Sequence, residues 1–468
     1  MVPLQAALAR VRLLWAHHKN EIIAAIVIGI PVAAYFALVV DRSEPSPYNL
    51  YIVASPRTEE EALNRLQKSA ALQGLEIQGI KILPNVIRLE DDSPEAATAK
   101  ARYILEQRNA LLVIGNMNSQ PTEHSLPIYF GVRPQIPFIA TVQTDEKLLR
   151  ECDEKCYGVN PAPLLQLSPV NTEQAQWAVK FAIEHGKSRF LIVRDNDSTN
   201  KTYTKSLVTA YHRALAGLGQ EFAVQKHEAT LAEVPQDIRT MSPDCVLYAG
   251  GPDDGSALVK MLKGSGEGLM IILSDSAVSA QIMSDPKLIV RTTEFTNQTD
   301  ATDYRNHVSV YAMDGAAIAK QLIEDLRARG FDWRFRIKAW FGRQTVEDAR
   351  RNLVRVMREN IRLRTSYYGA AETATSPGSP TVYAFSYKPG ADDPQSEVPF
   401  GRRAGGIFHV WQWRPGSNVM ADIDQWHPQK GDIIAVARQR GILRPRPSMQ
   451  TQTPAIRLAL GRERVSSN

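Results

Sequence analysis

The sequence predicts an α/β protein with two Rossmann-like lobes, each built on a parallel sheet. A multi-strand hinge would join the lobes, and one transmembrane helix would precede them. Three observations lead to this prediction: two successive series of alternating strand and helix patterns, apolar runs that end in Gly or polar clusters, and an uncharged apolar run near the N-terminus. Alternating strands and helices are typical of parallel sheets. The chain of 468 residues, 44% hydrophobic, is long enough for two or three domains.

The first series predicts a lobe over residues 48–167. We expect strands at residues 50–54, 77–83, 87–89, 111–114 and 138–141. We expect helices at residues 59–74, 94–108 and 122–130. The last two strands each end in a polar loop, and parallel sheets bind ligands beyond the carboxyl ends of their strands. These loops therefore place Ser119, Gln120 and Thr144 at one edge of a ligand cleft.

The second series predicts a second lobe over residues 168–290. It begins with a crossing strand at 167–170. The other expected elements are strands 189–194, 222–226, 244–248 and 269–273, and helices 171–185, 203–218, 235–241 and 256–263.

The chain is then expected to cross back, and three later segments follow. Residues 291–335, with a helix at 310–329, would complete the first lobe. Residues 345–425, with a basic helix at 345–364, would complete the second lobe. Residues 426–468 are polar, basic and rich in Pro, which predicts a disordered tail.

The N-terminus predicts the location of the protein. Residues 22–40 (IIAAIVIGIPVAAYFALVV) are uncharged and, at about 1.5 Å per residue, nearly span a hydrocarbon core of about 30 Å. Basic residues before this run place residues 1–21 in the cytoplasm and the bulk of the chain outside. The alternative is a cleaved signal peptide, but residues 38–40 are Leu-Val-Val, which is not a small-x-small cleavage site. We therefore expect an uncleaved signal anchor, with residues 41–47 as a tether.

Composition and motifs exclude several classes of function. A net charge of +5 on so long a chain does not indicate a nucleic-acid partner. Cys152 and Cys156 could form a short-range disulfide or remain two free thiols, and Cys245 is expected in the core. The nine His residues show no metal-ligand spacing, and the sequence has no Gly-x-Ser-x-Gly, P-loop or complete calcium-loop motif. We expect no metal, no cofactor and no enzyme activity.

One ordered set of motifs points to a known family. The segment 111–149 gives a strand, then Gly-x-x-x-Ser-x-x-Thr, Ile-Tyr, Ile-Pro-Phe-Ile and Thr144. This order resembles the leucine/isoleucine/valine-binding proteins, which are type I periplasmic binding proteins and the solute receptors of branched-chain amino-acid ABC importers. The resemblance covers roughly residues 48–415, and its later motifs are FLIVRD (190–195), CVLYAGG (245–251), IILSD (271–275) and YAMDGAAIAKQL (311–322).

The resemblance implies a set of ligand-binding residues. Ser119, Thr144 and the backbone at Val142 would hold a carboxylate, with Gln120 beside them. Asp275 would meet an ammonium group, and Tyr203 would close over the ligand from the second lobe. The alternative is that Ser119, Thr144 and Asp275 cap helices and that Tyr203 is an ordinary core or surface residue. Gly251 stands where the family has an aromatic residue, which implies a more open pocket or a ligand other than a branched aliphatic amino acid.

The expected function is a membrane-anchored, extracytoplasmic solute-binding receptor. Its ligand would be a small amphipathic molecule, such as an amino acid or a similar carboxylate. An ABC permease would be its partner in uptake, or a signalling protein would be its partner in sensing. The alternative is a sensory or protein-interaction ectodomain that keeps the fold without a transport ligand.

Overall fold

A computed structural model describes most of the two lobes. It covers residues 46–148 except 57, 59, 70 and 117, and then 163–196, 201–217, 225–262, 268–277, 289–294, 304–330, 345–362, 367–368, 382–383, 408–413 and 420–426. The expected membrane anchor (22–40), the Cys152 and Cys156 pair and the tail beyond residue 426 lie outside these residues. Among the helices that are described, none is both long and apolar enough to cross a membrane.

The first lobe is built on a six-stranded sheet in the order β2-β3-β1-β4-β5-β6. Its strands are β1 (Tyr48–Ala54), β2 (Glu76–Ile77), β3 (Ile80–Arg88), β4 (Ala110–Gly115), β5 (Phe138–Ala140) and β6 (Leu164–Gln166). All neighbouring pairs are parallel except the β2–β3 hairpin. Every residue of β4 is buried, as expected of a central strand covered on both faces.

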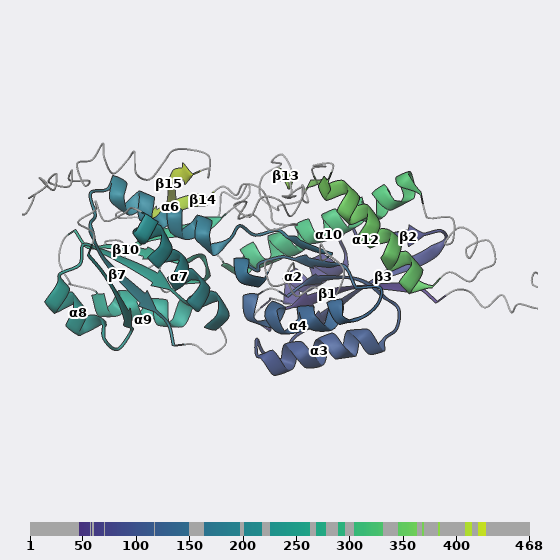
Figure 1. The fold of residues 1–468 in the computed structure, drawn as a ribbon, viewed down its shortest axis with the longest axis horizontal. Coiled ribbons are helices and arrows are strands. Elements are labelled where there is room, and N and C mark those ends of the chain that lie inside the picture. Colours follow the sequence, from purple (N-terminus) through teal and green to yellow (C-terminus); the bar gives the residue numbers. More distant parts are fainter. Residues whose placement is uncertain are drawn as a thin grey trace, which may run out of the picture.

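Helices cover both faces of this sheet (Figure 1). On one face lie α3 (Pro94–Glu106) and α4 (Ser119–Gly131), and on the other lie α2 (Glu60–Gln67), α10 (Tyr304–Arg329) and α12 (Val346–Arg362). The start of α3 follows from its sequence: Ser93 accepts a hydrogen bond from the Ala96 N–H at 3.1 Å, and Pro94 occupies the first turn.

The second lobe is built on a seven-stranded sheet in the order β15-β14-β11-β10-β9-β7-β8. Its strands are β7 (Arg189–Arg194), β8 (Gln225–Thr230), β9 (Cys245–Ala249), β10 (Met270–Leu273), β11 (Ile289–Glu294), β14 (Phe408–Trp413) and β15 (Met420–Trp426). The strands β14 and β15 are antiparallel additions to a parallel core. A separate two-stranded sheet pairs β12 (Tyr367–Tyr368) with β13 (Val382–Tyr383).

Helices again cover both faces of the second sheet. On one face lie α6 (Asn171–Glu184) and α7 (Lys201–Gly217), and on the other lie α8 (Val234–Met241) and α9 (Pro252–Leu262). Trp177 stacks on Phe181 within the core under α6, and Cys245 is buried as a free thiol. The expectation of a mixed α/β fold with parallel sheets is confirmed.

The basic helix α12 does not lie where the sequence suggested. We expected residues 345–425 to complete the second lobe, but α12 packs against α10 and β4 of the first lobe (Figure 1). Its buried residues Ala349, Leu353, Val356 and Met357 join the first-lobe core, and the Arg350 guanidinium donates to the Ala110 carbonyl of β4. Only β14 and β15 of the described residues in this range belong to the second sheet. The return to the second lobe therefore comes after α12.

Several boundaries also differ from the expected ones. The strand expected at 77–83 is interrupted, because Gln78 and Gly79 have positive φ and turn the chain between β2 and β3. The strand expected at 87–89 is not separate, because β3 continues to Arg88. The last strand of the first lobe is 164–166, not 167–170, and β11 remains in the second sheet. The helix α4 begins at Ser119 rather than at residue 122, so Ser119 and Gln120 lie in its first turn and not in a loop.

Candidate ligand site between the two lobes

The first-lobe side of the site lies beyond the ends of β4 and β5. Gly115 ends β4 with φ +136°, and a Cβ there would lie 2.4 Å from the Val53 carbonyl of β1, so only glycine fits this close approach. The chain then enters α4, where the Ser119 hydroxyl accepts a hydrogen bond from the Thr144 N–H at 3.3 Å. Ser119 and Thr144 are 2% and 5% exposed. The two predicted carboxylate anchors therefore lie together.

The alternative role expected for Ser119 and Thr144, capping of helices, does not fit their hydrogen bonds. Asn118 is the N-cap of α4, and Ser119 is bonded to Thr144 rather than to its own helix. The Thr144 hydroxyl is buried and has no hydrogen-bond partner among the described residues. Val142 and Gln120 are buried beside them. An unpaired buried hydroxyl costs free energy, and a ligand can supply its partner.

The second-lobe side of the site is a bonded group around Asp275, directly after β10. The Tyr203 hydroxyl donates to the Asp275 carboxylate, and the Gln174 amide donates to the same oxygen at 3.3 Å. Burial is the main reason that the pKa of Asp275 is raised, and these hydrogen bonds oppose the rise. Burial beside Asp275 also raises the pKa of Tyr203 well above its usual value. Tyr203 is therefore a neutral donor that holds the carboxylate.

The first turn of α6 connects the two sides. The Asn171 N–H donates to the Thr144 carbonyl at 2.9 Å, and Gln174, three residues further along the helix, reaches Asp275. Residues three apart lie on the same face of a helix. The predicted carboxylate anchors and the predicted ammonium anchor are thus linked by hydrogen bonds through the first turn of α6.

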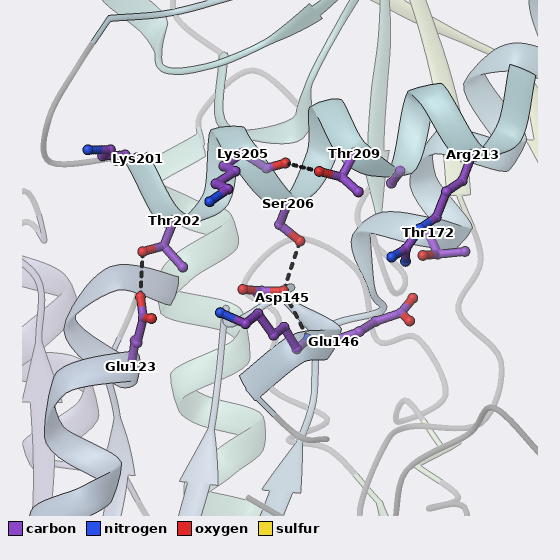
Figure 2. Close-up of a pocket in the computed structure, with 12 residues that line it drawn as sticks. Glu123, Asp145, Glu146, Thr172, Lys201, Thr202, Lys205, Ser206, Thr209 and Arg213 are labelled. Atoms are coloured by element: carbon purple, nitrogen blue, oxygen red, sulfur yellow. Dashed lines mark hydrogen bonds between the residues drawn. The ribbon is translucent and has the colours of Figure 1, made fainter. Parts of the chain in front are cut away.

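Two further hydrogen bonds join α7 of the second lobe to the first lobe (Figure 2). Thr202 donates to Glu123 of α4 at 2.7 Å, and Ser206 donates to Asp145 at 2.9 Å. Burial raises the pKa of Asp145, while its bonds from the Lys147 N–H and the Ser206 hydroxyl lower it. These contacts were not predicted from the sequence, because the partners lie 61 to 79 residues apart.

A cavity of about 360 Å³ lies beside these bonds, and its charges are divided between the lobes (Figure 2). Acidic residues come from the first lobe and basic residues mainly from α7; the charged lining residues are Glu123, Asp145, Glu146, Lys147, Lys201, Lys205 and Arg213. A signal was available in the sequence: Lys201, Lys205, Thr209 and Arg213 recur every four residues, which puts them on one face of a helix.

Comparisons with known proteins identify the fold. No family model and no curated protein matches the sequence. Solved structures do match. A leucine-binding protein from Thermotoga maritima superposes with a TM-score of 0.56 at 12% identity, over 81% of this chain and 99% of that one. A solute-binding protein of an ABC transporter from Rhodopseudomonas palustris, in complex with benzoate, gives a TM-score of 0.53 at 15% identity, over 81% and 96%. The chain has the type I periplasmic binding protein fold.

A third match agrees with this assignment. It is a branched-chain amino-acid transporter substrate-binding protein from Streptococcus pneumoniae, in complex with isoleucine, with a TM-score of 0.54 at 11% identity, over 82% of this chain and 100% of that one. The fold expected from the sequence resemblance is thereby confirmed. At these identities the likeness establishes the type I periplasmic binding protein fold alone, so the ligand has to be argued from the site.

The Gly250–Gly251 pair has a structural role in this version of the type I periplasmic binding protein fold. The Gly251 N–H donates to Asp195 at 2.7 Å, and Thr204 donates to the other oxygen of Asp195 at 2.8 Å. A Cβ at Gly250 would lie 2.6 Å from Asp195, so this position has no room for a side chain. Asp195 thus ties the ends of β7 and β9 to α7. Within the described residues, no group of three or more His, Cys, Asp or Glu side chains could hold a metal ion.

Proposed function

We propose that the protein is a membrane-anchored, extracytoplasmic solute-binding receptor whose lobes close on a small amphipathic ligand, such as an amino acid or a similar carboxylate. The observation that carries the proposal is the buried, unpartnered Thr144 hydroxyl, which lies beside Ser119 and is linked through α6 to Asp275. The matched structures support a ligand-binding receptor at a coarser level, because they are solute-binding proteins described with leucine, isoleucine or benzoate.

The first-lobe groups suit a carboxylate. Hydroxyls and backbone N–H groups donate charge-assisted hydrogen bonds to a carboxylate without a full counter-charge. Ser119, Thr144 and the backbone at Val142 supply such groups at the carboxyl ends of the strands. Each bond to a charged group contributes about 1.5–3 kcal/mol.

The second-lobe group suits an ammonium. The Asp275 carboxylate is partly buried, and burial without a cation disfavours its charged form. An ammonium group would restore the charged form, while Tyr203 would hold the carboxylate in place. No catalytic role is proposed for either residue.

The membrane anchor and the partner are part of the same proposal. The apolar run 22–40 and its basic flank support a signal anchor with the lobes outside the cytoplasm. A receptor with this fold would deliver its ligand to an ABC permease, or would signal through a partner protein.

A thermal-shift screen of amino acids and small carboxylates on the full-length chain in detergent tests this function. A compound that binds the folded state raises Tm by mass action. The double variant Ser119→Ala/Thr144→Val should weaken every carboxylate ligand at least about tenfold, because a tenfold change corresponds to about 1.4 kcal/mol. Thr240→Val, at an exposed position on α8, is the matched control. The proposal fails if no compound shifts the wild type.

A second candidate, a sensory or protein-interaction ectodomain, also has a specific observation in its favour. Tyr203 and Asp275 already bond to each other, and Thr202 and Ser206 already join α7 to the first lobe. A closed arrangement that needs no ligand would suit a permanent scaffold. A wild-type chain that stays closed in solution and binds no compound in the screen would favour this candidate.

A further inference from the structure

A second group of buried polar atoms without partners lies next to the proposed carboxylate site. The side-chain oxygens of Gln143 and Gln166 and both amide atoms of Asn171 have no hydrogen-bond partner in the part of the chain that the structure describes. All three residues are at most 1% exposed. Most buried polar groups in folded proteins are paired, so such a concentration needs a physical explanation.

Hydrogen bonds show that these residues form one cluster around the hinge. The Gln166 amide and the Ser168 hydroxyl both donate to the Gln143 carbonyl. The Asn171 N–H donates to the carbonyl of Thr144, the residue after Gln143. The cluster therefore joins the end of β6, the loop after β5 and the first turn of α6, where the chain passes from one lobe to the other.

The pairing of the amides decides what the cluster can bind. Gln143 uses its NH₂ group on the Asp145 carbonyl, and Gln166 uses its own on the Gln143 carbonyl. A backbone carbonyl accepts a hydrogen bond from the NH₂ group of an amide and not from its oxygen. These bonds therefore fix the orientation of both side chains and leave their oxygens as the unpaired atoms. Asn171 adds one further unpaired oxygen and an unpaired NH₂ group. The cluster is rich in acceptors and needs N–H donors.

From this geometry we infer that the ligand site extends to the hinge and that Gln143, Gln166 and Asn171 bind N–H donors on the ligand. The ligand would then be a carboxylate that also carries an amide, ureido or guanidino group. This inference rests on the proposed function, because the same molecule would place its carboxylate on Ser119 and Thr144. Asn171 contributes both a donor and an acceptor, so it can pair with an amide through two bonds.

The test compares amino acids that do and do not carry such a group. Glutamine and citrulline are titrated calorimetrically against norleucine, which has a side chain without N–H groups, on the full-length chain in detergent. We expect glutamine or citrulline to bind the wild type more tightly. Asn171→Leu and Gln166→Met should each weaken that ligand about threefold to tenfold and leave norleucine unchanged, because one neutral hydrogen bond has this effect. Gln236→Met, on the exposed face of α8, is the control.

The stability of the ligand-free variants provides a second measurement. Asn171→Leu should raise the Tm of the ligand-free protein by about 2–4 °C, because an apolar side chain has no unpaired polar atoms to bury. A residue that only supports the fold would lower Tm on substitution. Equal binding of norleucine and the N–H-bearing ligands, or equal losses for all three, would overturn the inference and leave the proposed function intact. If no carboxylate binds at all, both fail.

Discussion

The Tyr203 hydroxyl donates a hydrogen bond to the Asp275 carboxylate, so the two second-lobe groups proposed to meet the ligand already satisfy each other. Gln174 adds a second donor from α6. The arrangement keeps a carboxylate partly buried without a cation, which is unfavourable in the absence of ligand. The ligand-free protein thus loses stability at Asp275, and the ammonium group of the proposed ligand would offset this loss.

The first prediction follows from the raised pKa of Asp275. A carboxyl group whose pKa is raised on folding stabilises the fold fully below its ordinary pKa of 3.8, and this contribution is lost as pH rises through the folded-state pKa. Asp275→Asn has no carboxyl group at this position, so the stability of the variant does not fall in this way as pH rises. Its ligand-free Tm should exceed the wild-type Tm by about 2–4 °C at pH 7.5, and by less at pH 4.5. Asp253→Asn, at an exposed position of α9, should shift Tm equally little at both pH values.

The second prediction concerns the hydrogen bonds between α7 and the first lobe. Thr202→Val together with Ser206→Ala removes the bonds to Glu123 and Asp145 and should favour an open arrangement. Small-angle X-ray scattering of the ligand-free chain should then give a larger radius of gyration. Thr209→Val is the control, because Thr209 lies on the same helix and its hydroxyl donates to the Lys205 carbonyl of that helix. An unchanged radius in the double variant would show that these bonds do not hold the lobes together.

The third prediction concerns the Asp195 contacts. Gly250→Ala places a Cβ 2.6 Å from Asp195 and should lower the free energy of unfolding by about 1–3 kcal/mol. Asp195→Ala leaves the Gly251 N–H and the Thr204 hydroxyl without their acceptor and should cost about 2–4 kcal/mol. Urea unfolding measures both. Gly217→Ala, where a Cβ meets no atom within 4 Å, should be neutral or stabilising; equal losses for the two glycine variants would contradict this account.

The fourth prediction tests the position of α12. Leu353→Ala should destabilise the first lobe by about 2–5 kcal/mol, because it removes a fully buried side chain from that core. Hydrogen exchange should quicken in β4 and α10 and stay unchanged in β7 and β9. Arg351→Ala, a half-exposed position on the same helix, should destabilise the first lobe less than Leu353→Ala, because the buried Asp348 keeps its hydrogen bonds from Thr345 when the ion pair is lost. Faster exchange confined to the second lobe would refute the packing of α12 on the first.

The fifth prediction concerns topology. If residues 22–40 are a signal anchor, protease added outside the cytoplasmic membrane should digest residues 41–468, and the intact protein should sediment with the membranes. Three leucine-to-arginine or isoleucine-to-arginine changes within the run should release the chain from the membrane pellet or prevent its export, because each charge costs about 2.5–3.5 kcal/mol at the centre of a membrane helix. Recovery of a soluble, N-terminally trimmed wild-type product would contradict the anchor.

The sequence by itself determined the class of fold and most of its elements. The apolar run of β4, fully buried in the structure, and the Ser93–Pro94 start of α3 are local signals, because strand and helix patterns depend on residues close together in the chain. The motif order also brought Ser119 and Thr144 together, as the structure shows, while the role of these residues and of Asp275 as ligand anchors stays a proposal. The ligand and the membrane anchor that the sequence also suggested remain proposals.

Only the tertiary structure decided how distant segments meet. The amphipathic pattern of α12 shows that one face is buried but not which sheet buries it, and long-range packing placed it on the first lobe. The bond between Ser206 and Asp145 and the unpaired amide of Asn171 beside Thr144 depend on where the chain crosses between lobes. Hydrogen bonding requires atoms within about 3 Å, and spacing along the sequence does not specify such distances between separate lobes.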